Sequence, residues 1–377
     1  MTKRIAIVLP TLPTYRKDFF ELLNQSFLTK DMEFVVFHGT TTTKMVKSSD
    51  NNQFKELCFE TKENKYGGYT ITYLKGMLPA IKNYKPDGVV FLFNPAIFSF
   101  WSVLWCCRRR KIPYAIWSCG YVRPELSGIV KQLRESLLYQ VLRKAKIHIC
   151  YGHLYKQYLL SKKILPRNIF VAQNTINVEK ILYQNFSPEF SRVQGHIKVL
   201  YVGALIKNKK LEAAMLAVRN LRQKGYAIEF IIVGGGKILN ELQNFVVENK
   251  MESYIEIVGP KYGEELVTYF LNADVFLLAG SGGLAINEAM AYGLPVISTV
   301  GDGTVADLID QNGFLLKQFG DIEEISGKLE KFILLKPEVR LGMSFQSKNK
   351  IKEKASLQNM VDNYTQACIK LLETGKV

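Results

Sequence analysis

One stretch of the chain decides its fold: Ala279-Gly-Ser-Gly-Gly-Leu-Ala-Ile-Asn-Glu-Ala-Met-Ala-Tyr-Gly-Leu-Pro-Val-Ile-Ser298. It follows an apolar run at 275–278, passes through a cluster of glycines, enters a helix that carries Glu288, and leaves through Gly-Leu-Pro into a second apolar run. Strand, turn, helix and strand in this order are the repeating unit of a parallel sheet. Small residues at a helix start leave backbone N–H groups uncovered where the helix dipole is positive, so the turn predicts a phosphate site.

The same segment closely resembles the donor-nucleotide motif of glycosyltransferase family 4, whose members are retaining sugar transferases with the GT-B fold. The resemblance implies that Glu288 accepts hydrogen bonds from the ribose of a nucleotide-sugar. It also implies that the diphosphate rests on the turn residues Ser281, Gly282, Gly283 and Leu284. The family usually has a further Glu, associated with the donor sugar, at the position of Gly280. We therefore expect nucleotide-sugar binding, with Ser281 or exposed backbone making the sugar contacts; the alternative is a glycine turn without a ligand.

Three further segments match the family in order. Tyr201 to Lys210 is similar to the family's strand and loop with Gly-Arg and Lys-Gly, which implies donor contacts from Gly203, Lys209 and Lys210, although Ala204 stands where the family has Arg. A lysine there neutralises charge that builds on a departing diphosphate. The turn at Gly234 brings the chain close to the ligand, and Pro260 and Lys261 lie where the family holds the base through backbone groups.

A dinucleotide-binding oxidoreductase is disfavoured. The glycine turn at 234–236 lacks the third glycine of the Gly-x-Gly-x-x-Gly pattern, because position 239 is Leu. No acidic residue closes the following strand, where that family holds the ribose.

The N-terminal half contains the candidates for the acceptor. Tyr15 and Arg16 precede a helix in a pattern similar to enzymes that build bacterial surface polysaccharides, and Arg16 either clamps a phosphate or carboxylate or lies inert on the surface. Cys119 stands where many relatives have a His near the reacting sugar. Asn94 and Asn174, both at strand ends, are further candidate acceptor contacts.

Charge is distributed unevenly along the 377 residues. The net charge is +16, and residues 1–190 hold 28 Lys and Arg against 13 Asp and Glu, whereas the remainder holds 22 against 21. The basic half predicts an acidic partner such as an anionic membrane surface or a phosphorylated acceptor. Nucleic acid is disfavoured because no nucleic-acid-binding motif accompanies the charge.

The cysteines and the apolar runs of the chain predict where in the cell the protein lies. Six cysteines form no Cys-x-x-Cys pair, which disfavours zinc and indicates reduced thiols. The longest apolar run, Ala96 to Cys107, is too short to span a bilayer and ends at the Arg108 cluster. It predicts either a buried helix or an in-plane membrane contact through Phe98, Trp101 and Trp105. We expect a cytoplasmic protein, peripheral on the inner face of the plasma membrane.

Alternating strands and helices predict an α/β protein of two tandem doubly wound, Rossmann-like domains with an interdomain cleft, the GT-B architecture. Residues 1–185, joined by a C-terminal helix at 357–377, form the acceptor domain, and residues 190–350 form the nucleotide-sugar domain. Strands are predicted at 4–9, 33–37, 88–93, 114–117, 147–150 and 169–172, and then at 198–202, 228–233, 255–258, 275–278 and 296–298. The polar segment 183–191 is the predicted linker.

The resemblance implies a retaining glycosyltransferase that transfers a sugar from a UDP- or GDP-linked donor, without cofactor or metal, to a lipid-linked or membrane-associated saccharide. Bacterial capsule, O-antigen or exopolysaccharide synthesis is the expected setting. Lys209, Glu288 and Arg16 are the candidate catalytic residues. No protein base is needed, because the leaving diphosphate accepts the acceptor proton on the same face. The second hypothesis is a non-catalytic partner subunit or sugar-binding module, favoured by the three departures at Gly280, Ala204 and Cys119.

Overall fold

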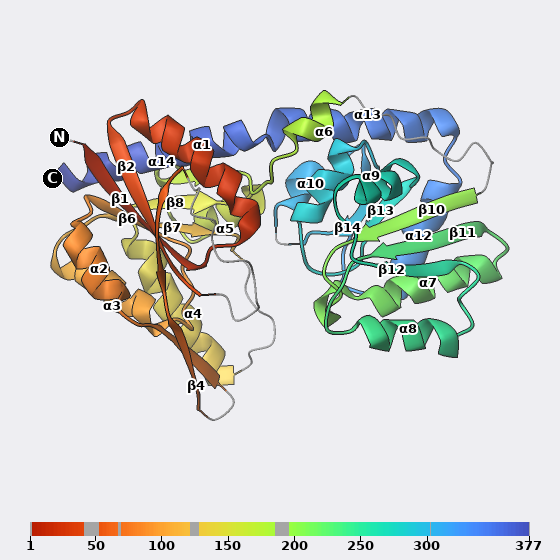
Figure 1. Ribbon diagram of the computed structural model, residues 1–377, viewed down its shortest axis with the longest axis horizontal. Coiled ribbons are helices and arrows are strands. Elements are labelled where there is room, and N and C mark those ends of the chain that lie inside the picture. The colour runs from red at the N-terminus through yellow and green to blue at the C-terminus, as the bar shows by residue number, and fades with distance from the viewer. Residues whose placement is uncertain are drawn as a thin grey trace. The chain divides into compact units, whose positions relative to one another are not determined.

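The computed structural model describes residues 2–40, 53–66, 69–120, 128–184, 196–301 and 303–376. The chain divides into two compact units, the first formed by Met1–Gln173 and Leu357–Val377 and the second by Asn174–Ser356 (Figure 1). The predicted linker lies, from residue 185 onward, outside the described residues. No helix in the described ranges is both long and apolar enough to cross a membrane.

The first unit is built on a parallel sheet with the strand order β3-β2-β1-β6-β7-β8-β9. The order reverses between β1 and β6, which makes the carboxyl ends of these two strands the expected ligand position of a doubly wound sheet. The strands are β1 (Lys3–Thr11), β2 (Met32–Gly39), β3 (Lys55–Phe59), β6 (Gly88–Phe91), β7 (Tyr114–Ser118), β8 (Ile147–Cys150) and β9 (Ile169–Val171).

Helices cover both faces of this sheet because its strands are apolar on both sides. Along β1, Ile5 and Ile7 pack into a core with α1 (Lys17–Leu28) and the C-terminal α14 (Leu357–Glu373), whereas Ala6 and Val8 face α2 (Met77–Tyr84), α3 (Phe98–Arg109) and α4 (Gly128–Lys144). A further helix, α5 (His153–Ser161), follows β8. The return of α14 to this sheet explains why the last residues of the chain belong to the first unit.

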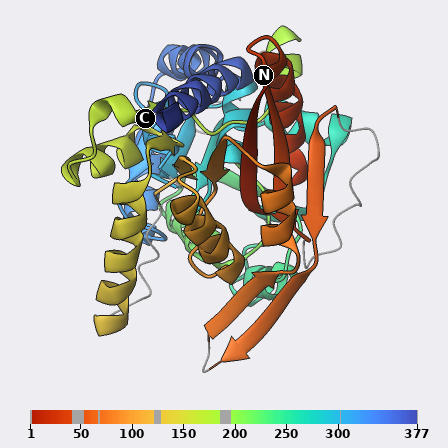
Figure 2. The same cartoon turned by 90° about the vertical axis from the view of Figure 1, so that its left-hand side faces the viewer.

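An antiparallel hairpin stands apart from the seven-stranded sheet. It consists of β4 (Thr61–Tyr66) and β5 (Tyr69–Leu74) and projects from the body of the unit in Figure 2. It is not among the strands predicted from the sequence. Two glycines, 67 and 68, separate the polar run at 61–66 from a run rich in Thr, Tyr and Ile at 69–74, and a Gly-Gly pair between two such runs is a hairpin signal.

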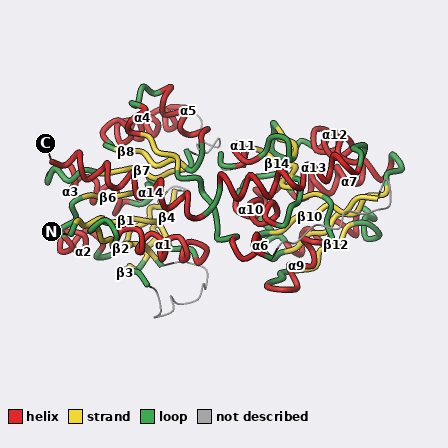
Figure 3. The backbone as a smooth tube through the Cα atoms, turned by 90° about the horizontal axis from the view of Figure 1, so that it is seen from above, coloured by secondary structure: helices red, strands yellow, loops and turns green. Residues whose placement is uncertain are grey.

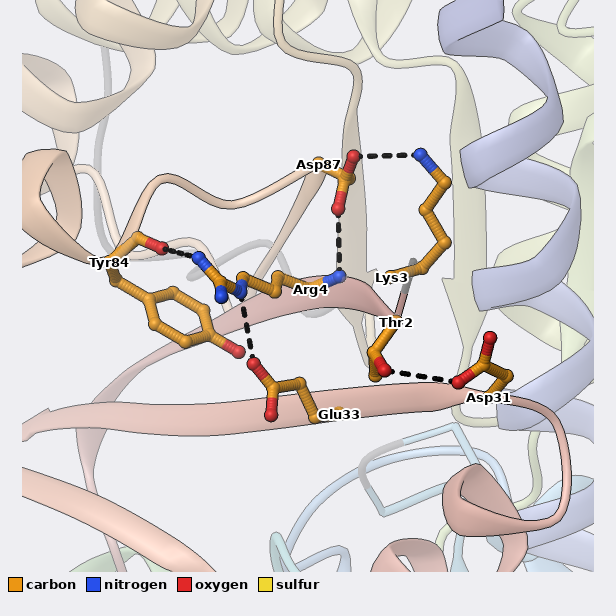
Figure 4. A network of polar contacts seen from close by, with 7 residues as sticks. All are labelled: Thr2, Lys3, Arg4, Asp31, Glu33, Tyr84 and Asp87. Carbon is orange, nitrogen blue, oxygen red and sulfur yellow. Dashed lines mark hydrogen bonds and ion pairs between the residues drawn. The ribbon is translucent and has the colours of Figure 1, made fainter.

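Ion pairs join the strands at the amino end of β1. The Asp87 carboxylate, at the start of β6, accepts hydrogen bonds from Lys3 Nζ and Arg4 N, both at 2.9 Å (Figure 4). Arg4 Nε donates to Glu33 of β2 at 3.0 Å, and its Nη1 donates to the Tyr84 carbonyl at 3.5 Å. These side chains are largely exposed, so they fix the order of neighbouring strands more than they add to stability. They occupy the edge opposite to the carboxyl ends.

The second unit repeats the architecture with the parallel strand order β12-β11-β10-β13-β14-β15. Figure 3 shows its strands, in yellow, between helices, in red. The order reverses between β10 and β13. The strands are β10 (His196–Val202), β11 (Ala227–Val233), β12 (Ile255–Gly259), β13 (Val275–Leu278), β14 (Val296–Thr299) and β15 (Gly313–Leu316).

The helices of the second unit surround one continuous core. They are α6 (Glu179–Tyr183), α7 (Leu211–Gln223), α8 (Leu239–Glu248), α9 (Gly263–Leu271), α10 (Leu284–Ala291), α11 (Val305–Leu308), α12 (Ile322–Ile333) and α13 (Pro337–Lys354). The two predicted doubly wound α/β sheets are therefore confirmed. The strand β15 was not predicted from the sequence.

Candidate functional site

The candidate site lies where the strand order of the second sheet reverses. The loop after β10 and the loop after β13 meet there, as expected for neighbouring parallel strands. Ser281 N donates to the Asn208 carbonyl at 2.9 Å, and Lys209 Nζ donates to the Ser281 carbonyl at 2.6 Å. Two segments more than 70 residues apart in sequence are thus joined by a backbone bond and a charge-assisted bond, and Lys209 lies against the glycine turn.

Every carbonyl oxygen at the start of this turn is held by a donor. The carbonyl of Ala279 accepts from Gly320 N at 3.0 Å, and that of Gly280 accepts from Thr299 Oγ1 at 2.8 Å. The next carbonyl is the one bound by Lys209. Because Thr299 is fully buried and its Oγ1 also accepts from Gly301 N at 3.2 Å, the turn is fixed from three sides.

The N–H groups that follow have the opposite environment. Within the described ranges, those of Gly282, Gly283, Leu284 and Ala285 donate to no acceptor. They form the end of the turn and the first residues of α10, where the helix dipole places partial positive charge. Successive uncovered N–H groups at a helix start are an anion site, and the adjacent Lys209 ammonium adds a full charge.

Close backbone approach explains why this turn is made of glycines. A Cβ at Gly280 would lie 2.1 Å from the Asn208 carbonyl oxygen, and one at Gly282 would lie 2.5 Å from Lys209 Nζ. Gly301, with φ +59°, approaches the Gly282 carbonyl just as closely, since its Cβ would lie 2.0 Å away. The absence of a Glu at position 280 thus has a physical cause: the turn at Asn208 and Lys209 occupies the space that any side chain would need.

The turns after β10, β11 and β12 continue the same edge. Gly203 N donates to the Val233 carbonyl at 3.0 Å, and Gly234, with φ +149°, lies so close to Gly203 that a Cβ would be 1.8 Å from its carbonyl oxygen. Pro260 packs next to this glycine turn, 3.7 Å from where a Cβ of Gly235 would be. Lys261 Nζ pairs with Glu265 at 3.2 Å. The predicted donor residues of these three turns therefore share one edge of the sheet.

Glu288 lies on α10, one turn beyond the uncovered N–H groups. Its side chain is half-buried, and loss of hydration raises the pKa of its carboxyl. In the part of the chain that the structure describes, no group donates a hydrogen bond to this carboxylate. Burial of the neighbouring Tyr292, and to a lesser extent the charge of Glu288, raise the pKa of Tyr292 to about 12. A partly desolvated acceptor of this kind is suited to hydroxyl donors from a ligand.

Lys210 has a backbone role beside its charge. It adopts the left-handed conformation, with φ +56°, and ends the turn before α7. Its side-chain carbons lie next to Gly320, whose own N–H holds the glycine turn. Lys209 therefore contacts the turn itself, and Lys210 contacts a residue that supports it.

Sequence reasoning missed two polar side chains of this region. Thr299 ends β14, where the apolar pattern gave no sign that its hydroxyl bridges two loops. Asn287, fully buried on α10, donates from Nδ2 to Thr175 Oγ1 at 2.8 Å and lies 3.4 Å from the Asn174 carbonyl. A polar residue inside an apolar helix face was the available signal for Asn287.

The acceptor candidates lie in separate surroundings. Asn174 belongs to the second unit and is buried against α10. Asn94 and Cys119 follow β6 and β7, which are neighbours in the first sheet, and the Asn94 carboxamide caps the N–H of Ala96 at 3.0 Å. Tyr15 is exposed and lies near the Arg16 guanidinium.

Arg16 is not a surface residue, so the alternative of an inert surface arginine is wrong. Its guanidinium is almost fully buried, lies 4.3 Å from the ring centroid of Trp117, and donates to the Tyr151 hydroxyl. Trp117 is the penultimate residue of β7 and Tyr151 follows β8, so Arg16 joins the β1–α1 loop to the carboxyl ends of two strands. Cation–π contacts of this kind are stronger when desolvated.

Residues 184–355 match the family model of glycosyl transferases group 1. The chain is also similar to an amylovoran biosynthesis glycosyltransferase of Erwinia amylovora, with 34% identity over 35% of each chain. It is 25% identical to a capsular polysaccharide biosynthesis glycosyltransferase of Staphylococcus aureus over 44% of each chain. An uncharacterised glycosyltransferase of Methanocaldococcus jannaschii is 26% identical over 81% of this chain and 82% of its own.

The first three curated relatives are matched over only 35%, 49% and 36% of their length. Solved structures extend the likeness to the whole chain. A glycosyltransferase from Rickettsia africae superposes with a TM-score of 0.71 at 16% identity, covering 98% of this chain and 99% of its own. An Anabaena protein solved in complex with UDP gives 0.70 at 12% identity over 97% and 99%. At such identities the likeness establishes the fold, which is GT-B, as predicted.

Proposed function

We propose that the protein is a retaining glycosyltransferase that transfers a sugar from a nucleotide-sugar to a lipid-linked or membrane-associated saccharide in bacterial capsule, O-antigen or exopolysaccharide synthesis. The observation that carries the proposal is the turn at 279–284, with its carbonyls held and its N–H groups uncovered beside Lys209. The match of the same residues to the family model supports it, as does the similarity to glycosyltransferases of amylovoran and capsular polysaccharide biosynthesis.

The turn is suited to a leaving diphosphate. Negative charge grows on the diphosphate as the bond to the sugar breaks, and donors fixed in advance stabilise it without reorganisation. The N–H groups of Gly282 to Leu284 supply the donors, and Lys209 and Lys210 supply the charge. Lys209 Nζ is already within 2.6 Å of the turn. With the positive charge coming from these groups, we propose turnover without a metal ion or cofactor.

Glu288 is proposed to bind the ribose. Its carboxylate lies one helical turn from the N–H groups, half-buried and without a donor among the described residues. Ribose hydroxyls would supply hydrogen bonds to a charged acceptor, each contributing about 1.5–3 kcal/mol. The backbone turns at Gly203, Gly234 and Pro260 are proposed to hold the base, and either UDP or GDP fits this mode.

The proton of the acceptor hydroxyl needs a destination. We propose that the leaving diphosphate oxygen takes it on the face where the new bond forms, so that the anomeric configuration is retained. We propose that Arg16 serves the acceptor from inside the first unit by holding Trp117 and Tyr151, because its guanidinium is almost fully buried against them. Tyr15, Asn94, Cys119 and Asn174 are the further proposed acceptor contacts.

The proposed setting is the cytoplasmic side of the plasma membrane. Residues 1–190, most of which belong to the first unit, contain 28 Lys and Arg against 13 Asp and Glu and therefore most of the basic excess of the sequence. An anionic membrane surface attracts such a protein by about 1 kcal/mol for each basic residue near the head groups.

Turnover of sugar donors tests the function. The purified chain is incubated with UDP- and GDP-sugars and a bacterial lipid extract that supplies acceptors. Release of nucleoside diphosphate and transfer of label to the lipid phase are measured, and NMR reads the anomeric configuration of the product. We expect transfer with retention, and a loss of 100-fold or more in Lys209→Ala, since removal of one such donor typically costs 10²–10³.

Lys207→Ala is the matched control, because Lys207 lies in the same short turn but is exposed and pairs with Glu241 at 3.9 Å. Inverted product would contradict the retaining mechanism. Binding of a nucleotide without turnover under every condition would favour the non-catalytic partner subunit.

A further inference from the structure

Helix α3 presents aromatic side chains on its solvent-facing side. Phe98 and Trp105 are 57% and 58% exposed, and Trp101 between them is half-buried. These positions are spaced by three and four residues, so they form one stripe about 10 Å long. The opposite side of the helix, which includes Phe100 and Val103, packs into the core. The run is therefore a packed helix with a second, outward apolar face.

The stripe departs from the usual pattern of a helix on a water-facing surface. Such a helix has polar residues on its outer side, because exposed aromatic surface is poorly hydrated. Here the outer side is aromatic and then basic: Arg108, Arg109, Arg110 and Lys111 follow the stripe and are all exposed. The Arg109 guanidinium lies 5.3 Å from the Trp105 ring centroid, so an aromatic and a basic side chain are in contact at the end of the helix.

The hairpin adds apolar surface beside the start of this helix. Thr72 N donates to the Ala96 carbonyl at 3.1 Å, and Leu74 N donates to Ser99 Oγ at 2.8 Å, so β5 runs along the entry to α3 (Figure 2). The alternate residues Ile71 and Tyr73 point away from these contacts and are exposed. An isolated two-stranded hairpin is marginally stable in water, and a further surface against it would stabilise it.

We propose that the aromatic stripe of α3 (Phe98, Trp101 and Trp105) lies in the interfacial layer of an anionic bilayer, with Arg108 to Lys111 at the phosphate head groups. Tryptophan and arginine side by side on one helix face match that layer, where aromatic rings meet acyl chains and guanidinium groups meet phosphates. The large basic excess of the N-terminal half supplies charge complementarity over a wider area. The proposal rests on the proposed function in one respect, that the acceptor resides in a membrane.

Tryptophan fluorescence tests the proposal directly, because the chain has only three tryptophans. Trp117 is fully buried and Trp101 half-buried, so Trp105 is the main exposed emitter on α3. The full chain is mixed with phosphatidylglycerol–phosphatidylcholine vesicles in which a fraction of the lipids is brominated near the glycerol end of the acyl chain. We expect quenching and a blue shift, both strongly reduced in Trp105→Phe, whose binding to unlabelled vesicles is retained.

Partition measured by flotation separates the apolar from the charged contribution. Phe98→Ser with Trp105→Ser should weaken binding to anionic vesicles at least tenfold, whereas Leu154→Ser, at an exposed apolar position on α5, should leave it unchanged. Arg108→Gln with Arg109→Gln should weaken binding to anionic vesicles and leave the weak binding to pure phosphatidylcholine unaltered. Thermal unfolding of each variant checks that it is folded.

The proposal is overturned if wild-type chain does not float with anionic vesicles, if it floats with unquenched Trp105, or if the stripe variants bind as well as wild type. Dimerisation through the stripe, seen as a concentration-dependent mass that Trp105→Ser abolishes, also overturns it. None of these assays uses a nucleotide. If the chain turns over a sugar donor but does not bind vesicles through the stripe, only the membrane proposal is refuted. If it binds vesicles through the stripe but turns over no donor, only the proposed function is refuted.

Discussion

Replacing Gly280 with alanine tests the packing that fixes the donor turn. The added Cβ would lie 2.1 Å from the Asn208 carbonyl oxygen, 2.5 Å from Lys209 C and 2.7 Å from Lys209 Cα, where ordinary contacts are 3.4–4 Å. All three neighbours are backbone atoms, so the turn or the segment beneath it has to move by more than an ångström. Overpacking of this kind costs about 1–3 kcal/mol.

The same movement breaks the bonds between the two loops. Ser281 N to the Asn208 carbonyl and Lys209 Nζ to the Ser281 carbonyl contribute about 1 kcal/mol each. Gly280→Ala is thus expected to destabilise the second unit by about 3–5 kcal/mol, a fall in its unfolding temperature of roughly 6–20 °C. Gly280→Glu, which writes the family's usual residue into this position, is expected to remove nucleotide binding instead of improving it.

Thermal unfolding with and without nucleoside diphosphate measures both effects. Gly327→Ala and Gly342→Ala are matched controls in α12 and α13, because a Cβ at either position meets nothing within 4 Å. Both should stabilise the unit by about 0.5–1 kcal/mol. A Gly280→Ala chain as stable as wild type, with an undiminished nucleotide shift, would refute the packing argument.

Three further outcomes are expected. Thr299→Val removes the hydroxyl that donates to the Gly280 carbonyl and accepts from Gly301 N, so nucleotide affinity measured by titration calorimetry should fall about tenfold. Thr299→Ser, which keeps the hydroxyl, should recover the affinity. No recovery in Thr299→Ser would mean that Thr299 acts only by filling space. Glu288→Gln removes a desolvated charge, so unfolding in denaturant should show an unliganded protein at least as stable as wild type, while nucleotide affinity drops by about 10-fold or more; unchanged affinity would contradict the ribose contact. Burial lowers the pKa of His148 from 6.5 to about 4, so the unfolded chain binds a proton that the folded chain does not as pH falls through this window. Folding stability should therefore fall by on the order of 3 kcal/mol between pH 6.5 and 4, and denaturant unfolding at several pH values should show a flatter profile in His148→Phe.

The edge of the second sheet that carries the glycine turn was largely predictable because its pattern is local. A strand, a run of small residues and a helix with Glu288 predict a phosphate site, and apolar runs located most of the strands that position it. The sequence shows that residue 280 is Gly where the family has Glu, but it does not show why. The cause is a contact with Asn208, 72 residues away, which no local pattern encodes.

Other features depended on tertiary packing and escaped the sequence for the same reason. Arg16 looked like a candidate surface clamp until the ends of β7 and β8 placed Trp117 and Tyr151 around it. In the run from Ala96 to Cys107, α3 buries one side and exposes the other, so the predicted buried helix is present and the membrane contact stays a proposal. When a helix is apolar all round, its hydropathy pattern does not predict which side is buried and which is exposed.

The central claim is that the second unit holds a nucleoside diphosphate on the turn at 279–284 with its ribose on Glu288. Titration calorimetry of the purified chain with UDP, GDP, ADP and CMP, repeated with Glu288→Ala, tests it most directly. The account predicts that one nucleoside diphosphate binds the wild type, and that Glu288→Ala loses at least tenfold in affinity while remaining folded. Absence of binding by every nucleotide at millimolar concentration, or equal affinity in the variant, would contradict it.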